Sequence, residues 1–336
     1  MSHKILVTGA GGFIGGFVVE AALSRNYETW AGVRASTSRE YLQDSRIRFV
    51  NLDFGNAVHL KEQLLELKKE IGRWEYIVHN LGVTKSKNRD DFDKINYGYL
   101  RNFVEALTAC EMVPDKFIYM SSLGAWGKGD EKDYTPIRPT DTPHPDTRYG
   151  QSKLRSEQFL ESVTGFPYIA LRPTGVYGPR EKDYYLMFKS IKCGIDFGVG
   201  YRRQLLTFIY IKDLVNAIFA AIDSPAVRKG YFLSEGKAYT TSEFRRYVAQ
   251  ALHKRWVLPV IVPCWFLWII SAIAEWVAAK MGKSSTLNRD KYHIMSQRNW
   301  LCDISEAQHE IGFSPRYSLE EGIQETIAWY KSHHWL

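Results

Sequence analysis

The stretch that decides the fold is ILVTGAGGFIG, residues 5–15. Apolar β-formers run into a glycine cluster and an apolar run of helical length follows, which predicts a buried strand, a tight turn and a helix. In G-x-x-G-x-x-G spacing the first glycine permits the turn, the second lets a pyrophosphate approach the backbone, and the third lets the helix pack on the strand. The helix N-terminus offers free N–H groups to phosphates. An ordinary glycine-rich bend is the alternative to a dinucleotide site, which we predict at Gly9, Gly12, Phe13, Ile14 and Gly15.

Composition narrows the remaining possibilities. The 336 residues exceed one typical domain, and 45% hydrophobic with 24% charged residues is an ordinary globular composition. A formal charge of +7 suits an anionic cofactor, a phosphate-bearing substrate or an anionic membrane surface. The chain has no Lys/Arg run and no nucleic-acid-binding motif, so we expect no nucleic-acid partner. The four cysteines lack metal-site spacing and the N-terminus leaves no room for a signal peptide, so we expect no metal, no disulfides and a cytoplasmic location.

The second predicted strand, 27–33, is followed by Arg34 at its tip. An acidic residue at this point of a dinucleotide fold selects NAD. A guanidinium can instead hold a 2′-phosphate with two hydrogen bonds, so Arg34 favours NADP over NAD, with a solvated strand-end arginine as the alternative. A third strand, 47–50, leads to Leu52 and Asp53, which we expect beside the cofactor. Asp53 could accept a hydrogen bond from the adenine amine, or it could serve as the N-cap of the next helix.

Strands and helices continue to alternate as far as residue 120. The fourth strand is expected at 75–80, a helix at 93–110 and a fifth strand at 115–120. This alternation predicts a doubly wound parallel sheet that binds ligands at the carboxyl ends of its strands. Asn80 and Gly82 follow the fourth strand, so we expect them to pass close to the cofactor.

Candidate catalytic residues follow the fifth strand. Ser121 and Ser122 lie at its carboxyl end, and Tyr149 and Lys153 open a later helix. Residues four apart share a helix face, so the ammonium should favour phenolate and lower the tyrosine pKa toward neutrality. A serine hydroxyl from the strand end can hold the carbonyl oxygen that the phenol protonates. As a bare pattern Y-x-x-x-K is common, and an ordinary helix surface pair is the alternative.

Taken in order, these motifs resemble an extended short-chain dehydrogenase/reductase of the NAD-dependent epimerase/dehydratase group. The fourth motif is LRPTGVYGPR at 171–180, and later landmarks at 208–214 and 312–315 extend the resemblance over nearly the whole chain. The resemblance implies an α/β, Rossmann-type doubly wound parallel sheet with a smaller, mostly C-terminal substrate-binding α/β subdomain. The expected larger domain covers 1–175 and about 208–234; the smaller one covers about 176–207 and 235–336.

The resemblance also implies roles for single residues. Tyr149 matches the general acid/base, Lys153 lowers its pKa and holds the nicotinamide ribose, and Ser122 orients the reacting oxygen. Ser121 is then structural, and Asn96 matches a family asparagine in the long helix. The nicotinamide is walled by Pro173, Thr174 and Val176.

Two departures separate the chain from the sugar-nucleotide branch. No asparagine of the kind that precedes the nucleotide-binding helix lies between Arg180 and Gly198, and QLLTF at 204–208 replaces Gln-x-Arg-Asp-Phe. The Val33-Arg34 strand tip instead resembles dihydroflavonol reductases and 3-beta-hydroxysteroid dehydrogenases. This implies an NAD(P)-dependent ketoreductase or alcohol dehydrogenase for a hydrophobic substrate such as a keto-lipid or steroid. The alternatives are an NAD-dependent nucleotide-sugar epimerase or dehydratase, and a non-catalytic cofactor-sensing protein.

An apolar stretch at 257–274 carries no charge before Glu275. It is interpreted as a lipid- or steroid-facing helix of the substrate domain, as ordinary core, or as a membrane attachment. Peripheral membrane contact through 257–281 would bring its tryptophans to the interface. The polar stretch 280–291 predicts a loop.

The family resemblance further implies a homodimer. Its contacts would involve the two long helices predicted at about 93–109 and 149–163, whose apolar faces suit either a partner chain or intramolecular packing.

Overall fold

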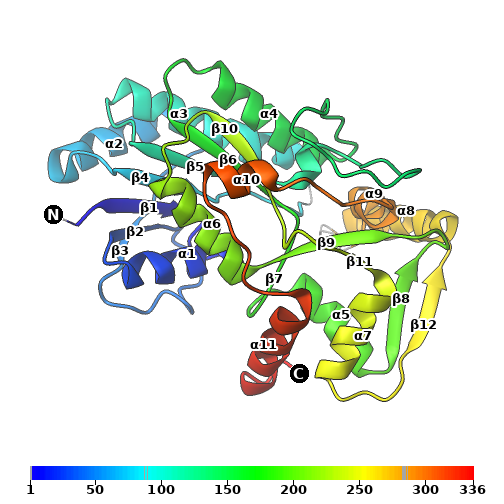
Figure 1. Ribbon diagram of the computed structural model, residues 1–336. Coiled ribbons are helices and arrows are strands. Elements are labelled where there is room, and N and C mark those ends of the chain that lie inside the picture. The colour runs from blue at the N-terminus through cyan, green and yellow to red at the C-terminus, as the bar shows by residue number, and fades with distance from the viewer. Residues whose placement is uncertain (1, 87, 89, 282–284, 286) are drawn as a thin grey trace.

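The computed structural model describes residues 2–86, 88, 90–281, 285 and 287–336. Its centre is a seven-stranded sheet in which all neighbouring strands are parallel. The strands are β1 (Lys4–Thr8), β2 (Glu28–Gly32), β3 (Arg48–Val50), β4 (Tyr76–His79), β5 (Lys116–Met120), β6 (Tyr168–Pro173) and β10 (Lys229–Leu233). Their order is β10-β6-β5-β4-β1-β2-β3, so the chain direction across the sheet reverses between β1 and β4 (Figure 1). The predicted doubly wound parallel sheet is confirmed, and ligands of such sheets bind at the carboxyl ends beside the reversal.

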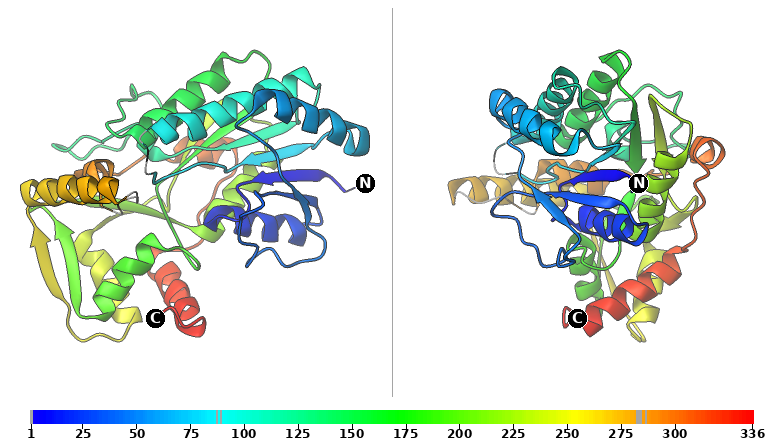
Figure 2. Two further views of the ribbon diagram at one scale, coloured as in Figure 1. Left: turned by 180° about the vertical axis from the view of Figure 1, so that it is seen from behind. Right: turned by 90° about the vertical axis from the view of Figure 1, so that its left-hand side faces the viewer.

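Helices cover both faces of this sheet because its strands alternate their side chains between two cores. In β1, Ile5 and Val7 join a buried cluster that includes residues of α1 (Phe13–Ser24) and α6 (Ile211–Asp223), whereas Leu6 joins a second cluster that includes residues of α2 (Ala57–Ile71), α3 (Tyr99–Ala109) and α4 (Arg148–Ser162). The first face carries α1 and α6. The second face carries α2, α3 and α4, and Figures 1 and 2 show the two layers on opposite sides.

A smaller α/β part lies beyond the carboxyl ends of the sheet (Figure 1). Its strands are β7 (Gly175–Tyr177), β9 (Leu205–Tyr210) and β11 (Ala238–Thr240) in one sheet, and β8 (Ile195–Val199) with β12 (Leu258–Val262) in another. Its helices are α5 (Asp183–Lys192), α7 (Thr241–Ala251), α8 (Cys264–Lys280) and α9 (Arg289–Ser296). The chain ends with α10 (Ser305–Glu310), which contacts β10 of the central sheet, and α11 (Leu319–Ser332). The sequence analysis expected the chain to re-enter the larger domain at about residue 208, and this position lies within the strand β9.

Three expected elements differ from the structure. The helix expected at 93–110 consists of a π-helical segment, η1 (Phe92–Gly98), followed by α3. The apolar stretch 257–274 is divided at Pro263, which cannot donate a backbone hydrogen bond and suits a helix start, so the strand β12 precedes α8. The loop expected at 280–291 is shortened by α9, which begins at Arg289; residues 282–284 and 286 lie outside the described residues.

Candidate active site

The glycine-rich turn joins β1 to α1 and leaves room for a close ligand. Gly9 has a φ of +67°, and a Cβ added there would lie 2.8 Å from the carbonyl oxygen of Asn80 at the end of β4. A Cβ added to Gly15 would lie 2.3 Å from the Gly9 carbonyl oxygen, so the helix can approach the turn only with glycine. Gly12 is the N-cap of α1 and makes no side-chain capping bond. This open helix N-terminus fits the pyrophosphate of a dinucleotide.

The loop after β2 lies against the same turn. A Cβ added to Gly11 would come within 2.1 Å of the Thr37 methyl carbon. Thr37 forms a turn with Arg34: its hydroxyl accepts from the Arg34 N–H at 3.1 Å, and its own N–H donates to the Arg34 carbonyl at 2.9 Å. The Arg34 side chain is exposed beside the glycines, whereas Phe13 and Ile14 are half-buried in the first turn of α1.

Leu52 is buried and Asp53 is exposed just after β3. The Asp53 carboxylate accepts from the Gly55 N–H at 3.2 Å and lies 3.2 Å from Nδ1 of His59. Asn56, not Asp53, is the N-cap of α2, and its side chain accepts from N–H groups of the first turn. The alternative that Asp53 caps this helix is therefore wrong, and its contact with the adenine stays a prediction.

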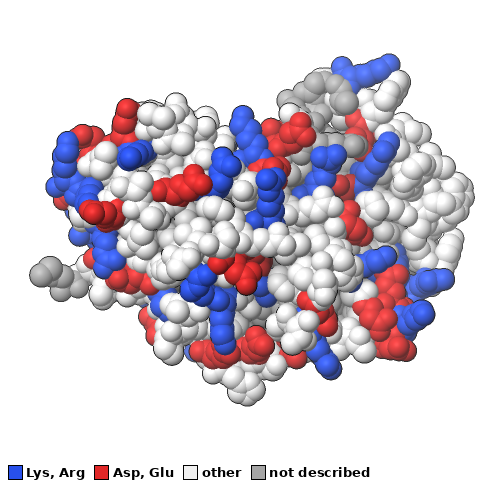
Figure 3. All heavy atoms as spheres, turned by 90° about the horizontal axis from the view of Figure 1, so that it is seen from above, with Lys and Arg blue, Asp and Glu red and all other residues white. Residues whose placement is uncertain are grey.

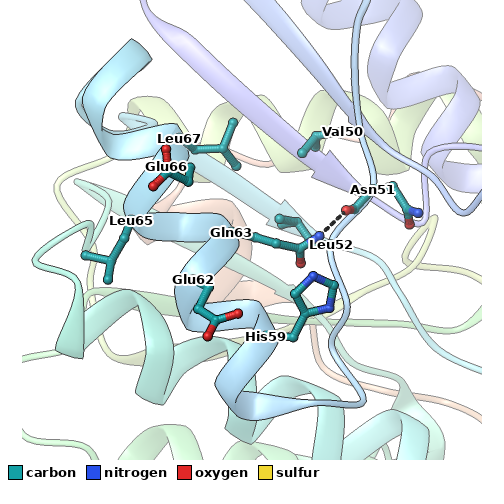
Figure 4. Close-up of a pocket in the computed structure, with 9 residues that line it drawn as sticks. All are labelled: Val50, Asn51, Leu52, His59, Glu62, Gln63, Leu65, Glu66 and Leu67. Atoms are coloured by element: carbon teal, nitrogen blue, oxygen red, sulfur yellow. Dashed lines mark hydrogen bonds between the residues drawn. The ribbon is translucent and has the colours of Figure 1, made fainter.

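A pocket of about 500 Å³ opens between the end of β3 and α2 (Figure 4). Gln63 spans it: its side-chain oxygen accepts from the Asp53 N–H at 2.9 Å and its nitrogen donates to the Asn51 carbonyl at 3.0 Å. The lining residues are Val50, Asn51, Leu52, His59, Glu62, Gln63, Leu65, Glu66 and Leu67. None of the candidate catalytic side chains lines this pocket, so we do not assign it to the substrate.

The segment after β4 passes close to Lys153. A Cβ added to Gly82 would lie 2.9 Å from Oδ1 of Asn96 and 3.4 Å from Nζ of Lys153. The buried Asn96 accepts from the Val83 N–H at 2.8 Å, and its side-chain nitrogen lies 3.1 Å from the Val83 carbonyl oxygen and 2.9 Å from Oγ of Ser152. Asn96 therefore holds this segment against α4, the helix that carries Lys153.

Ser122 and Tyr149 meet at the carboxyl edge of the sheet. Ser122 is the N-cap of a short helix, η2 (Leu123–Ala125), and its Oγ accepts from the Gly124 N–H at 3.1 Å. The Tyr149 phenol lies close enough to Ser122 for the serine side chain to lower the pKa of the phenol. Gly150 allows this contact, because a Cβ there would lie 2.3 Å from the Gly124 carbonyl oxygen. The sequence analysis did not single out Gly150, because the residue that it contacts, Gly124, lies 26 positions earlier in the chain.

Lys153 completes the cluster from one turn further along α4. Its side chain is 5% exposed, its Nζ donates to the Met120 carbonyl at 2.7 Å, and Nζ lies 5.9 Å from the centre of the Tyr149 ring. Burial lowers the pKa of Lys153 to about 8, although the nearby Glu157 carboxylate acts in the opposite direction. The phenol, the ammonium and the serine hydroxyl therefore converge.

The expected effect of Lys153 on Tyr149 is wrong for this structure. Burial raises the pKa of Tyr149 to about 12, and the Ser122 side chain offsets only part of this rise. The ammonium is bonded to the Met120 carbonyl and lies 5.9 Å from the ring centre, and desolvation dominates the pKa of Tyr149. Tyr149 is consequently a protonated phenol at neutral pH, the form that donates a proton.

A buried ionic network supports the cluster from below. Arg172 on β6 forms an ion pair with Glu157 on α4, with 2.7 Å between Nη2 and Oε2, and both side chains are about nine-tenths buried. The Ser121 hydroxyl donates to Glu157, and the Arg172 guanidinium lies 3.7 Å from the Trp126 ring centre. Ser121 therefore has a structural position. The spacing of Glu157 and Arg172 in the sequence gave no indication that they form an ion pair.

The predicted nicotinamide wall lies next to Ser122, because β5 and β6 are paired. Pro173 ends β6, Val176 lies in β7, and Thr174 joins the two strands with its N–H donating to the Leu233 carbonyl at 3.0 Å. The Thr174 hydroxyl is buried and has no hydrogen-bond partner among the described residues. Such an orphaned hydroxyl fits a polar group of a bound ligand.

Helix α9 contributes residues that the sequence analysis did not single out. Asp290 accepts from the backbone N–H of Arg148, 142 residues away in the chain, at 3.1 Å. Its neighbour Lys291 lies 3.4 Å from Asp183 on α5, and Asp183 also pairs with Lys85. α9 therefore connects the catalytic helix, the substrate-side helix and the segment after β4.

Comparison with known proteins agrees with this geometry. A model of the NAD dependent epimerase/dehydratase family matches residues 5–232. UDP-glucose 4-epimerase of Vibrio cholerae is 25% identical over 334 residues, covering 97% of this chain and 95% of that protein. The decarboxylating sterol-4-alpha-carboxylate 3-dehydrogenase erg26 of Schizosaccharomyces pombe is 26% identical over 341 residues, covering 97% of each. The solved structure of Thermotoga maritima UDP-glucose 4-epimerase with UDP-glucose aligns with a TM-score of 0.78 at 21% identity, covering 98% of this chain and 99% of that one.

Within the described residues, no helix combines the length and apolar character needed to cross a membrane. The glycine cradle, the orphaned Thr174 hydroxyl and the convergence of Ser122, Tyr149 and Lys153 all fit a nicotinamide dinucleotide. The protein is therefore an NAD(P)-dependent enzyme, and the chain belongs to the NAD dependent epimerase/dehydratase family.

Proposed function

We propose that the protein transfers hydride between a nicotinamide cofactor and the ketone or alcohol of a hydrophobic substrate, such as a keto-lipid or steroid. The observation that carries this proposal is the convergence of the protonated Tyr149 phenol, Ser122 and the buried Lys153 at the carboxyl edge of the sheet. A bound nicotinamide supplies the hydride for reduction or accepts it for oxidation.

The chain itself handles the proton. In reduction, the Tyr149 hydroxyl donates its proton to the carbonyl oxygen, and the Ser122 hydroxyl donates a hydrogen bond to the same oxygen. Ser122 is free to donate because its oxygen already accepts from the Gly124 N–H. The phenolate that remains regains a proton from solvent. Oxidation of an alcohol follows the same steps in reverse.

The substrate side of the fold supports a hydrophobic substrate. Leu206 and Thr207 stand where the sugar-nucleotide branch has Arg-Asp, and the Thr207 hydroxyl donates to the Trp300 carbonyl at 2.6 Å. The nearby Arg298 is buried, and its guanidinium donates to the carbonyls of Val199 and Ser296, both at 2.6 Å. These groups are engaged within the protein, which disfavours their use on the two phosphates of a sugar nucleotide.

NADP is the favoured cofactor. Arg34 is exposed beside the glycine turn, where the adenosine end of a dinucleotide extends from the pyrophosphate. No acidic residue stands at this strand tip to accept from a ribose 2′-hydroxyl, and a guanidinium there suits a 2′-phosphate.

An NAD-dependent nucleotide-sugar epimerase or dehydratase is the second candidate, favoured by the relatives named UDP-glucose 4-epimerase. Epimerisation needs no net oxidation, so cofactor consumption separates the two functions. We expect keto-lipids or steroid ketones to deplete NADPH absorbance and UDP- or dTDP-sugars to leave it unchanged. Conversion of UDP-glucose to its epimer with tightly bound NAD, and no depletion with any ketone, would establish the second candidate instead.

A further inference from the structure

We propose that α8, together with the β8–β12 pair, is a membrane-docking face that inserts into the interfacial region of an anionic lipid bilayer. This surface stands independently of the reaction proposed above, because its evidence is exposure, residue type and charge.

Helix α8 presents an unusually apolar face to solvent. Trp265 is 66% exposed, Trp276 is 59% exposed and Trp268 is 48% exposed. At about 100° per residue, these tryptophans and five exposed neighbours cover more than half of the helix circumference. The neighbours are Phe266, Ile269, Ile270, Ile273 and Val277. Tryptophan is the side chain enriched where one end must be apolar and the other wet, as at a membrane interface.

The opposite side of α8 is the one packed on the protein. Leu267 and Ser271, one turn apart, are buried, and the carboxylate of Glu275 lies 3.6 Å from Arg289 on the adjacent α9. The only acidic residue of the helix is thus directed to α9 and not to the apolar face. A helix held in this way offers one side for contact, as an interfacial helix does.

Exposed apolar side chains also lie on the neighbouring strands. Phe197 on β8 and Leu258 on β12 are exposed on one face of this parallel pair, and Ile261 is exposed on the other. Seen from above, the end of the molecule where α8 lies in Figure 1 has a white part, beside which acidic and basic side chains cluster (Figure 3). Exposed apolar patches of this kind mark interaction sites.

Exposed basic side chains lie on the segments next to α8 and the β8–β12 pair. The segments 189–204 and 244–291 contain twelve Lys or Arg and only three Asp or Glu, although the whole chain has a formal charge of only +7. Lys280 lies 3.9 Å from the Trp276 ring centre at the end of α8. The exposed basic rim consists of Arg202, Arg203, Lys254, Arg255 and Lys280. Each basic side chain near an anionic lipid surface increases the affinity of a protein for that surface about fivefold.

The same rim argues against a second copy as the occupant. A symmetric dimer through this patch would bring the patch of each copy against itself, and therefore basic rim against basic rim. Anionic headgroups complement both the apolar centre and the charge around it.

The face is also joined to the active site. Helix α8 packs on α9, and Asp290 of α9 accepts from the N–H of Arg148, the residue before Tyr149. Docking through α8 would therefore bring the start of the catalytic helix near the bilayer surface, where a hydrophobic substrate dissolves.

The test is co-sedimentation with vesicles, without substrate or cofactor. Phosphatidylcholine vesicles with about 30% phosphatidylserine are compared with pure phosphatidylcholine. The test variant combines Trp265→Gln, Trp268→Gln and Trp276→Gln. The matched control combines Val58→Gln, Leu65→Gln and Val227→Gln, which removes three exposed apolar side chains far from α8. Circular dichroism and the melting temperature show whether each variant is folded.

We expect the unaltered protein and the control to bind the anionic vesicles, with blue-shifted tryptophan fluorescence, and the tryptophan variant to bind at least about tenfold more weakly. Arg202→Gln with Arg255→Gln should weaken binding to anionic vesicles but not alter the fold. Equal binding by the tryptophan variant, or no binding by the unaltered protein, would overturn the proposal. A lipid-free dimer that the tryptophan substitutions dissociate, without vesicle binding, would identify the face as a self-association surface instead.

Discussion

The backbone N–H of Arg148 donates a hydrogen bond to the carboxylate of Asp290 across 3.1 Å. Arg148 is the first residue of α4, and N–H groups at a helix start have no partner within the helix. A carboxylate at this end is also favoured by the helix dipole. Because Tyr149 is the next residue, Asp290 on α9 positions the phenol relative to Ser122.

Asp290 can be tested as a positioning residue. We expect Asp290→Ala to lower kcat about tenfold because the first turn of α4 loses its acceptor, with dinucleotide affinity nearly unchanged. Asp290→Asn keeps an acceptor oxygen and should restore most of the activity. Steady-state kinetics and cofactor titration of both variants measure this. An unchanged kcat in Asp290→Ala would show that α9 does not position Tyr149.

Lys153 should give the fold a distinct pH dependence. Its pKa is about 8 in the folded protein against 10.5 for an ordinary lysine, so above about pH 8 the unfolded chain binds more protons at this site. The contribution of Lys153 to the free energy of unfolding therefore rises with pH, by about 1 kcal/mol per unit between about pH 8 and pH 10. Tyr149, whose pKa is raised, acts in the opposite direction from about pH 9 upward.

Lys153→Met should abolish this rise, which urea unfolding at several pH values can measure. Lys61→Met, at an exposed position of α2, is the control and should unfold with the pH dependence of the unaltered protein. Parallel curves for the unaltered protein and Lys153→Met would contradict the burial of a charged Lys153.

The ion pair beneath the site should be costly to break. We expect Arg172→Met to lower the free energy of unfolding by about 3–5 kcal/mol, because it leaves the buried Glu157 carboxylate without its partner. Arg155→Met removes the exposed pair with Asp93 and should cost about 1 kcal/mol or less. Denaturant unfolding of both variants gives the comparison, and equal losses would mean that Glu157 and Arg172 do not depend on each other.

Arg34 tests the cofactor choice. An Arg34→Asp variant should lose affinity for NADP by about tenfold or more and bind NAD at least as well as before, because a carboxylate repels the 2′-phosphate and can accept from a ribose hydroxyl. Dinucleotide titrations of both proteins measure the two affinities. A preference for NAD in the unaltered protein would refute the assignment of Arg34.

Local patterns were enough to predict the sheet and to single out candidate site residues that stand in contiguous motifs. The turn at Gly9 to Gly15 follows from glycine spacing between a strand and a helix, and the Tyr149–Lys153 pair follows from helical periodicity. Both depend on residues a few positions apart, for which backbone geometry fixes the neighbourhood.

Contacts between distant segments could not be predicted in this way. The Asp290–Arg148 and Glu157–Arg172 contacts depend on how helices pack on the sheet, and the raised pKa of Tyr149 depends on burial that the sequence does not specify. The apolar stretch at 257–274 was also ambiguous, because hydrophobicity alone does not say whether a segment faces the core or solvent; in the structure the tryptophans of α8 face solvent.

The central claim is that Tyr149 transfers the proton that accompanies hydride transfer. Its most direct test is the kcat of Tyr149→Phe with a substrate ketone, measured by nicotinamide absorbance alongside the affinity for the dinucleotide. The account predicts a fall in kcat of at least about a hundredfold, with the affinity retained because the glycine turn still holds the pyrophosphate. Turnover at the rate of the unaltered protein would contradict it.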